Sequence, residues 1–237
     1  MPRFYVPDTA YKVGEEVVLP PEAVHHAMRV LRMREDDEAE LFDGNGNSAK
    51  GTIHFAKDFA SVKILETAYT QENSLKIVLL QSLVSNEKMD WIVEKACELG
   101  VTELIVFPAD RSEVKLVGDK LLKRMERWNK IVVSACKQCK RSALLKVSWL
   151  SSLQDFNPEG IQKNFIMMPQ ATLSEKAEEK IESVSFAIGP EGGLSQREIQ
   201  LLTEKGFEPK QLGRFVFRTE TAGIVAASYA HTLWDWN

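Results

Sequence analysis

Hydrophobic positions along the chain follow two different spacings, and their order predicts the architecture of the larger part of the protein. From about residue 75 onward, short continuous apolar runs take turns with stretches in which apolar residues recur every three or four positions. Continuous runs of about four to eight apolar residues are typical of buried strands, and the wider spacing is typical of amphipathic helices. The alternation predicts an α/β domain built on a mainly parallel sheet.

Five apolar runs are expected to form the strands of this sheet, at 75–84, 103–109, 164–168, 184–188 and just before Leu212. The helices expected between them have apolar stripes. One stripe, in a helix that Gly100 ends, consists of Met89, Ile92, Val93, Ala96 and Cys97. A longer helix carries Leu121, Met125, Trp128, Val132 and Cys136. Further helices are expected at 173–181 and at about 221–234.

The first 70 residues have a different pattern. Three strand-like runs, separated by turn sequences, follow a helical stretch at 22–33 and lie at 38–42, 50–55 and 61–66. Several short strands with close turns predict a small β-barrel. The polar segment 67–74 is expected to be a linker, which gives domains at 1–70 and 74–237.

Composition and cysteine content indicate the cellular compartment of the protein. Of 237 residues, 44% are hydrophobic and 27% are charged, which is ordinary for a globular protein. No apolar run reaches the roughly 20 residues of a membrane span, and residues 1–11 lack the apolar core of a signal peptide. The three cysteines cannot all pair within the chain, as expected in a reducing compartment. We therefore expect a cytoplasmic protein without membrane attachment.

Charge is unevenly distributed, and this changes what the net charge of −4 implies. The segment from Arg111 to Lys146 contains eleven basic and three acidic residues, so the remainder of the chain is strongly acidic. Such a segment suits the binding of a polyanion such as RNA. A solvated helix face would explain the same charges equally well.

The stretch "AIGPEGGLSQREIQ", residues 187–200, predicts a strand that runs directly into a tight loop and then a helix. Ser195 and Glu198 have the spacing of a capping box at the helix start. The three loop glycines would let a ligand approach the main chain closely. Neither phosphate-binding motif is present, and Glu191 would repel a phosphate. The loop favours a nucleoside-like ligand without phosphates, although a Gly-rich structural turn remains an alternative.

A second informative loop is "QLGRFVFRTETAG", residues 211–223. Arg218 and three polar residues precede a helix that has almost no polar residues. A helix cap would explain one or two of these polar residues, but an arginine offers a rigid donor fork for a carbonyl, carboxylate or phosphate oxygen. Glu220 as a structural partner of Arg218 is the alternative. Gly189 and Gly213 should both lie at the carboxyl ends of strands, where ligands of such sheets bind.

No metal site is expected. Cys136 and Cys139 have the C-x-x-C spacing, but they lie at the end of a long predicted helix, without a second pair nearby. The four histidines have no ligand spacing. The last predicted helix is apolar nearly all round and must be covered within the domain or by a second subunit, so we expect it to contribute to a homodimer.

These motifs together resemble those of a known family. The segments "IGPEGGLSQREI" and "LGRFVFRTETA" are similar to the paired C-terminal signature of the 16S ribosomal RNA uracil-N3 methyltransferases of the SPOUT class. Four other segments resemble further motifs of that family and occur in the same order: "PRFYV", "RVLRMREDD", "EKMDWIVEKACELGV" and "ACKQCKR". The resemblance covers nearly the whole chain.

The resemblance implies a PUA-like β-barrel followed by a SPOUT-type α/β domain with a deep trefoil knot. It also implies S-adenosylmethionine as the cofactor, a homodimer, and methylation of N3 of one uridine in the decoding region of 16S ribosomal RNA, within the small ribosomal subunit. The implied cofactor agrees with the loop pattern because it has a nucleoside, an amine and a sulfonium but no phosphate.

Carried over position by position, the implied cofactor-binding residues are Met168, Gly189, Pro190, Glu191, Gly192, Gly193, Leu212, Gly213, Phe217, Arg218, Thr219, Glu220, Thr221 and Ala222. The basic residues expected to contact RNA are Arg3, Arg29, Arg32, Arg34, Arg111, Lys137 and Arg141. The chain departs from the family pattern at Phe215, where an arginine is frequent, and at Lys140, where a glycine is common. These departures affect the RNA contacts more than the cofactor site.

The implied reaction requires the N3 proton of uracil to leave before or during methyl transfer. Arg218 and Glu191 are the expected catalytic residues: Arg218 would polarise a uracil carbonyl, and Glu191 would be one candidate proton acceptor beside Glu220 and water. Two rival functions are a non-catalytic RNA-binding protein, which would not bind S-adenosylmethionine, and a dinucleotide oxidoreductase, which the missing G-x-G-x-x-G motif disfavours.

Overall fold

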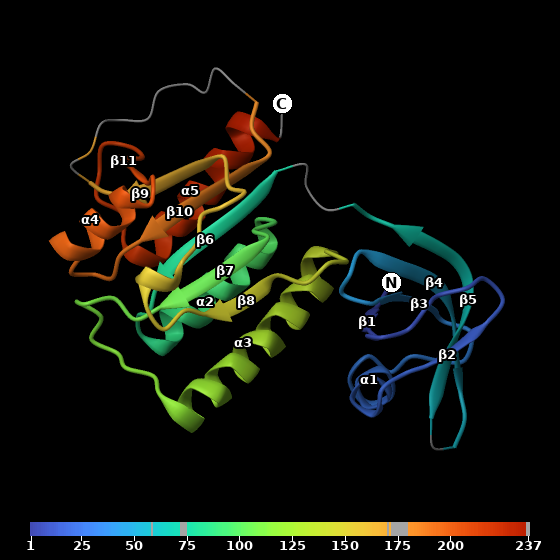
Figure 1. Cartoon of the computed structure of the whole chain (residues 1–237). Coiled ribbons are helices and arrows are strands. Elements are labelled where there is room, and N and C mark those ends of the chain that lie inside the picture. The colour runs from blue at the N-terminus through green and yellow to red at the C-terminus, as the bar shows by residue number, and fades with distance from the viewer. Residues whose placement is uncertain (58, 72–74, 170, 172–179, 236–237) are drawn as a thin grey trace. The chain divides into compact units, whose positions relative to one another are not determined.

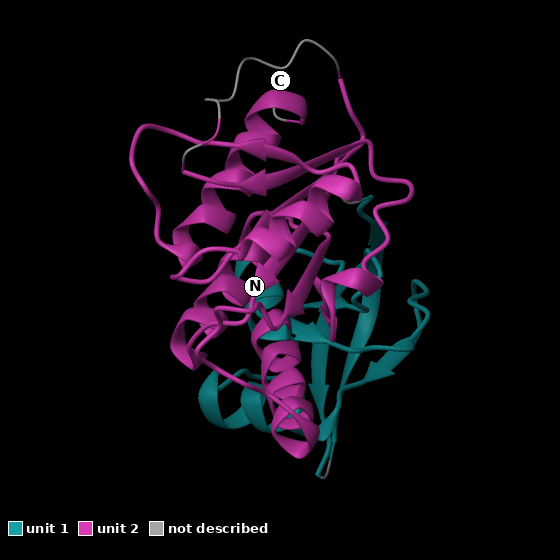
Figure 2. Cartoon of the chain, turned by 60° about the vertical axis from the view of Figure 1, so that its left-hand side comes forward, with its two compact units in different colours: residues 1–72, 133–144 teal, residues 73–132, 145–237 magenta. Residues whose placement is uncertain are grey.

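The computed structural model describes the chain except for residues 58, 72–74, 170, 172–179 and 236–237 (Figure 1). The chain divides into two compact units (Figure 2). The first unit comprises Met1–Glu72 and Val133–Leu144, and the second comprises Asn73–Val132 and Leu145–Asn237. The sequence pattern predicted one domain at 74–237, whereas the structure groups 133–144 with the first unit.

The first unit is built on a five-stranded sheet with strand order β1-β3-β4-β5-β2. Its elements are β1 (Arg3–Tyr5), β2 (Glu16–Val18), α1 (Pro21–His25), a π-helical turn (His26–Val30), β3 (Glu38–Phe42), β4 (Asn47–Phe55) and β5 (Ala60–Tyr69). β1 pairs in parallel with β3, and the other pairs are antiparallel. Alternate strand residues such as Leu41, Ile53 and Val62 are fully buried in one apolar core.

The predicted linker at 67–74 is wrong in its first part. Thr67–Tyr69 continue β5 and pair with Ala49, Ser48 and Asn47 of β4. These three residues can lengthen the strand without an apolar pattern because their backbone groups, not their side chains, form the ladder. β1 and β2 were not predicted from the sequence.

The second unit contains a six-stranded sheet in which every pair is parallel, in the order β11-β9-β10-β6-β7-β8. The strands are β6 (Lys76–Ser82), β7 (Glu103–Phe107), β8 (Lys146–Trp149), β9 (Lys163–Met167), β10 (Ser183–Ile188) and β11 (Glu208–Lys210). The helices are α2 (Asn86–Glu98), α3 (Gly118–Cys139), a 3₁₀ turn (Leu153–Asp155), α4 (Gln196–Glu204) and α5 (Thr219–Trp234). The part of α3 that follows Val132 is grouped with the first unit. The predicted parallel α/β domain is confirmed. The helix predicted at 173–181 lies largely outside the described residues.

Strand β6 is apolar on both of its faces because helices cover both sides of the sheet. Val78 and Leu80 belong to the core that includes Leu202 of α4. On the opposite face, Leu79 lies beside Gly223 of α5, where an added Cβ would approach it to 3.6 Å. This double coverage explains why β6 reads as a continuous apolar run.

The apolar stripes of the helices agree with the sequence pattern. The five residues predicted for the stripe of α2 are the five that the helix buries. In α3, Trp128, Val132 and Cys136 are buried, whereas Leu121 and Met125 are half-buried. Among the described residues, no helix is both long enough and apolar enough to cross a membrane.

The strand order places three chain segments together at one edge of the sheet. β9 has β10 on one side and β11 on the other, so the carboxyl ends of these parallel strands are adjacent. The amide of Met168 donates to the carbonyl of Lys210, 2.8 Å away, directly after β9 and β11. The loops after the three strands therefore converge, as expected for a ligand site in such a sheet. The trefoil knot stays a prediction.

Candidate active site

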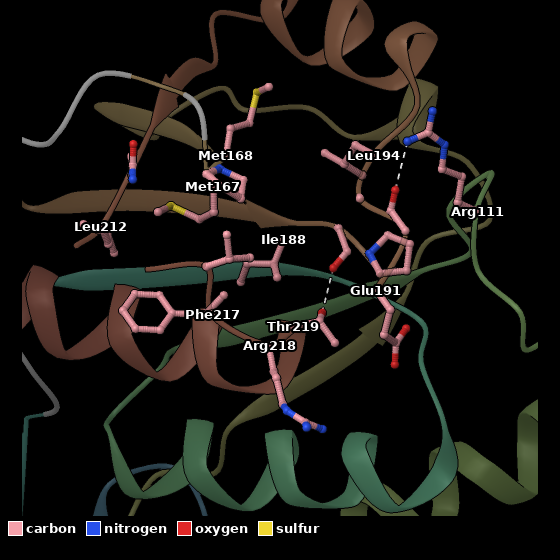
Figure 3. Close-up of a pocket in the computed structure, with 18 of the residues that line it drawn as sticks. Arg111, Met167, Met168, Ile188, Glu191, Leu194, Leu212, Phe217, Arg218 and Thr219 are labelled. Atoms are coloured by element: carbon pink, nitrogen blue, oxygen red, sulfur yellow. Dashed lines mark hydrogen bonds between the residues drawn. The ribbon is translucent and has the colours of Figure 1, made fainter. Parts of the chain in front are cut away.

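A cavity of about 720 Å³ lies at this edge of the second unit (Figure 3). Its volume is in the usual range of pockets for small molecules. Eleven of the predicted cofactor-binding residues line it: Met168, Gly189, Pro190, Glu191, Gly192, Gly193, Leu212, Phe217, Arg218, Thr219 and Ala222. Gly213, Glu220 and Thr221 were also predicted, but they are not among the lining residues. Most residues of the two loops therefore line one cavity, and their contact with the cofactor stays a prediction.

The first loop, 189–194, is shaped by its glycines. A Cβ at Gly189 would lie 2.8 Å from the backbone nitrogen of Leu194, so no side chain fits there. Gly193 has a φ of 70° and its amide donates to the carbonyl of Pro190 at 2.8 Å, which closes the turn. The capping box of Ser195 and Glu198 is present at the start of α4, as predicted.

The second loop, 211–218, is tied to the first by a buried relay of hydrogen bonds. The Thr219 hydroxyl donates to the carbonyl of Gly189 at 2.7 Å (Figure 3). The same hydroxyl oxygen accepts from Nε2 of Gln81, a fully buried residue of β6, at 3.1 Å. The relay fixes the spacing between the two loops, and Gln81 was not identified from the sequence because nothing in the local pattern marks it.

The cavity has an apolar end and a charged end. Figure 3 shows Met167, Leu212 and Phe217 together at one end, whereas Glu191 and Arg218 lie at the other. A flat aromatic ring would bury its surface at the apolar end, and a charged or hydrogen-bonding group would suit the other end. This division matches a nucleoside with a polar extension.

The charged end is organised by Lys88 of α2, which sequence analysis did not single out. Its Nζ lies 2.6 Å from Oε1 of Glu191 and 3.5 Å from Oε2 of Glu220. The hydrogen bond from Lys88 holds the pKa of Glu191 below its usual range, and the same bond raises the pKa of Lys88. Lys88 stands on the polar face of an amphipathic helix, where the sequence pattern gives no reason to prefer it to other lysines.

Arg218 occupies the N-cap position of α5, and the helix begins at Thr219 rather than near Thr221. Its side chain is exposed and, among the described residues, makes no hydrogen bond or ion pair. The alternative of a structural pair between Arg218 and Glu220 is not observed, because Glu220 faces Lys88 instead. The Arg218 guanidinium is therefore available to a ligand.

Arg111 was predicted as an RNA contact, and the structure places it at the cavity. Its guanidinium donates to the carbonyl of Gly192 at 2.9 Å (Figure 3). Arg111 also lines the cavity while its side chain is largely exposed. This hydrogen bond stabilises the conformation of the first loop.

Arg3 was also predicted to contact RNA, but the structure gives it a structural role in the first unit. It is 7% exposed. Its guanidinium donates to the carbonyls of Cys136 and Arg141 and to the hydroxyl of Ser142, at 3.0–3.2 Å, and pairs with Glu40 at 3.1 Å. Because Arg3 is buried and makes these contacts within the first unit, we assign it a structural role and do not carry it forward as an RNA contact.

The other predicted RNA contacts differ in exposure. Arg29, Arg32 and Arg34 are exposed. Lys137 and Arg141 are half-buried, and burial lowers the pKa of Lys137. Lys140, where the family commonly has glycine, adopts a left-handed φ of 64°.

Part of the basic segment is neutralised within the second unit. Arg124 and Arg127 of α3 both pair with Asp90 of α2, at 3.6 and 2.7 Å.

Among the described residues, the group with metal-ligand spacing is Glu35, Asp36 and His54. A hydrogen bond of 2.8 Å between His54 and Glu35 explains why these side chains lie together. The group contains no cysteine.

Comparisons with known proteins agree with this geometry. Residues 71–231 match the family described as the RNA methyltransferase domain, and residues 19–65 match the RNA methyltransferase PUA domain. Ribosomal RNA small subunit methyltransferase E of Bacillus subtilis (strain 168) is 32% identical over 245 residues, covering 96% of this chain and 95% of the relative.

Two solved structures with a bound cofactor are similar over almost their whole length. A methyltransferase from Legionella pneumophila, in complex with the cofactor SAM, is 32% identical with a TM-score of 0.90, covering 98% of each chain. Ribosomal RNA small subunit methyltransferase E of Neisseria gonorrhoeae, bound to S-adenosyl methionine, is 34% identical with a TM-score of 0.87, covering 99% of this chain and 98% of the other. The chain therefore belongs to the RNA methyltransferase family that contains the ribosomal RNA small subunit methyltransferases E.

Proposed function

We propose that the protein is an S-adenosylmethionine-dependent methyltransferase that methylates N3 of one uridine in the decoding region of 16S ribosomal RNA, in the small ribosomal subunit. One observation carries the proposal: the loops 189–194 and 211–218 converge on a single amphipathic cavity without a phosphate-binding motif. The relatives named for ribosomal RNA methylation, and the neighbours solved with S-adenosylmethionine, support it.

The residues that line the cavity fit this cofactor. Met167, Leu212 and Phe217 would hold the adenine ring at the apolar end, and Met168 stays a candidate contact. At the other end, the ionised Glu191 would accept hydrogen bonds from hydroxyl or amine groups but would repel a phosphate. When bound, S-adenosylmethionine supplies an electrophilic methyl group on a positively charged sulfur.

The chain's own contribution is to orient the uracil base and to favour its negative form. In the transfer, the N3–methyl bond forms, the methyl–sulfur bond breaks with its electron pair moving to sulfur, and N3 loses its proton. Arg218, whose guanidinium is free at the rim, would donate to a uracil carbonyl and stabilise the charge that develops on the ring.

The ion pair between Lys88 and Glu191 bears on which group accepts the N3 proton. Lys88 lowers the pKa of Glu191, which makes this carboxylate a weaker base and suits it to holding the cofactor. Glu220 does not line the cavity. We therefore propose that solvent at the exposed rim takes the N3 proton, rather than Glu191 or Glu220.

RNA binding is proposed for the first unit, which matches the RNA methyltransferase PUA domain. Arg29, Arg32 and Arg34 are exposed there and could neutralise phosphates. Lys137, Arg141 and Arg111 stay candidates. We also propose a homodimer and cytoplasmic residence. Half-buried apolar residues of α5, such as Ile224 and Val225, leave surface that a second copy could cover.

Two measurements test the proposed function. Calorimetric titration of the protein with S-adenosylmethionine should show binding, whereas absence of binding would favour the non-catalytic RNA-binding alternative. Nucleoside mass spectrometry of 16S ribosomal RNA should show that N3-methyluridine is missing in cells without the protein and returns with the wild-type gene. Unchanged N3-methyluridine in the deletion strain would overturn the proposal.

A further inference from the structure

Three separate elements bring charged side chains together around Lys88. Lys88 comes from α2, Glu191 from the loop after β10, and Glu220 from the first turn of α5. The ammonium group is 2.6 Å from one carboxylate and 3.5 Å from the other. Lys88 and Glu191 line the cavity, and Oε2 of Glu220 is buried without a hydrogen bond among the described residues.

We propose that Lys88 is a positioning residue that holds the carboxylate of Glu191 in place at the charged end of the cofactor cavity, beside the carboxylate of Glu220. This inference rests on the proposed function, and it adds a residue that acts through Glu191 rather than on the substrate. Without a cation between them, two neighbouring carboxylates repel each other, and one takes up a proton more readily.

Stability alone does not explain this arrangement. The Glu191 side chain is 51% exposed, so water screens its pair with Lys88 in the free protein. Exposed ion pairs contribute about 0–1 kcal/mol to folding. A bound cofactor would remove water from the charged end, and the same pair would then matter more because the effective dielectric constant falls.

The other charged residues at the cavity do not replace Lys88. Arg111 is bound to the carbonyl of Gly192, next along the loop. Arg218 has an exposed guanidinium that, within the described part of the chain, pairs with no carboxylate. Glu220 has the same sign as Glu191. Loss of Lys88 therefore leaves Glu191 beside a like charge, which should raise its tendency to protonate.

The test compares S-adenosylmethionine binding by calorimetry in wild type, Lys88→Met and Lys88→Arg at about pH 5.5 and about pH 8, above the usual range of a glutamate. Wild-type affinity should be nearly equal at the two values. Lys88→Met should bind about tenfold more weakly at the higher pH, and still more weakly at the lower pH, where Glu191 would accept a proton. Lys88→Arg should restore most of the affinity and the flat profile.

The same helix offers a matched control. Lys95 also bridges two carboxylates, Glu94 and Glu98, at 2.7 and 2.8 Å, but it does not line the cavity. Lys95→Met should leave both affinity and pH dependence unchanged. Should Lys88→Met fail to fold, Glu191→Gln provides the second variant: with no charge left to hold, its weakened binding should not depend on pH in this range.

Outcomes separate this inference from the proposed function. A wild-type protein that binds no S-adenosylmethionine would overturn the function itself. Wild-type binding that Lys88→Met leaves unchanged in strength and in pH dependence would overturn only the role of Lys88. An equal loss in Lys88→Arg and Lys88→Met would also overturn it, because the positive charge would then not be what matters.

Discussion

The two units each contain a network centred on one cation, and the networks differ in what surrounds them. In the first unit, Arg3 is 7% exposed, and its guanidinium donates to carbonyls and a hydroxyl and pairs with Glu40. In the second unit, Lys88 faces two carboxylates beside an open cavity. The first network is closed by main-chain groups, and the second has capacity left for a ligand.

The difference teaches how to distinguish a structural cation from a functional one. A buried guanidinium that donates to carbonyls far from it in the sequence stabilises the fold, because its loss would leave several buried acceptors without a donor. A partly exposed ammonium between carboxylates, such as that of Lys88, adds little to folding. The three chain segments that bring these charges together beside a cavity therefore point to ligand binding. Substitutions should therefore affect stability in the first unit and affinity or turnover in the second.

The largest expected effect is on folding, from Arg3→Met. Removing the guanidinium leaves Glu40 and buried acceptors unpaired, which should lower the free energy of unfolding by about 3–5 kcal/mol. Urea denaturation would measure it. Arg3→Lys should recover only part of the loss, since an ammonium lacks the planar fork. A change below about 1 kcal/mol would remove the contrast between the networks.

A comparable effect, but on catalysis, is expected for Arg218→Ala. Methyl transfer should fall by about 10²–10³-fold because a donor to the developing negative charge is lost. Calorimetric affinity for S-adenosylmethionine and the melting temperature should stay close to wild type, since Arg218 is exposed and, within the described part of the chain, has no partner. Normal single-turnover rates would rule out this role.

A smaller effect is expected where the two loops are joined. Thr219→Val removes the hydroxyl that links Gln81 to the carbonyl of Gly189, which should cost about 1–2 kcal/mol of stability. Weaker cofactor binding should accompany this loss because the loop spacing is no longer fixed. Thr219→Ser keeps the hydroxyl and should behave as wild type in both thermal melting and calorimetry.

The smallest expected effect is on the folding of Lys88→Met, whose stability should differ from wild type by less than about 1 kcal/mol near neutral pH. The pKa of Glu191 is lowered, so its contribution exists above the unfolded carboxyl pKa and is lost as pH falls through the folded value. The pKa of Lys88 is raised, so its contribution is lost only as pH rises through its folded value. The stability difference should thus be flat between about pH 7 and pH 10, and should change only at lower pH, where Glu191 of the variant takes up a proton more readily. A steep slope in that window would contradict this account.

Much of the second unit was predictable because the information is local. The stripe of α2, the capping box of α4 and the loop glycines each follow from residues a few positions apart. Short strands were missed: β1, β2 and β8 have three or four residues, too few to show a period. The extension of β5 was missed because its last residues are held by backbone pairing with β4.

The contacts at the site that were not predicted all join residues far apart in the sequence. Lys88 meets Glu191 across 103 positions, and Gln81 meets Thr219 across 138. The burial of Arg3 was not foreseen for the same reason, because its partner carbonyl at Cys136 lies 133 positions away. No local pattern carries such pairings, so charge and polarity were visible in the sequence but their partners were not.

The inclusion of Val133–Leu144 in the first unit has a consequence for dividing the gene. A fragment ending at residue 72 would keep all five strands of its sheet but would lack the carbonyl and hydroxyl groups that accept from Arg3. Transplanting the amino-terminal region as an independent cassette therefore requires a helical turn from far downstream, and the region is not a detachable module of contiguous sequence.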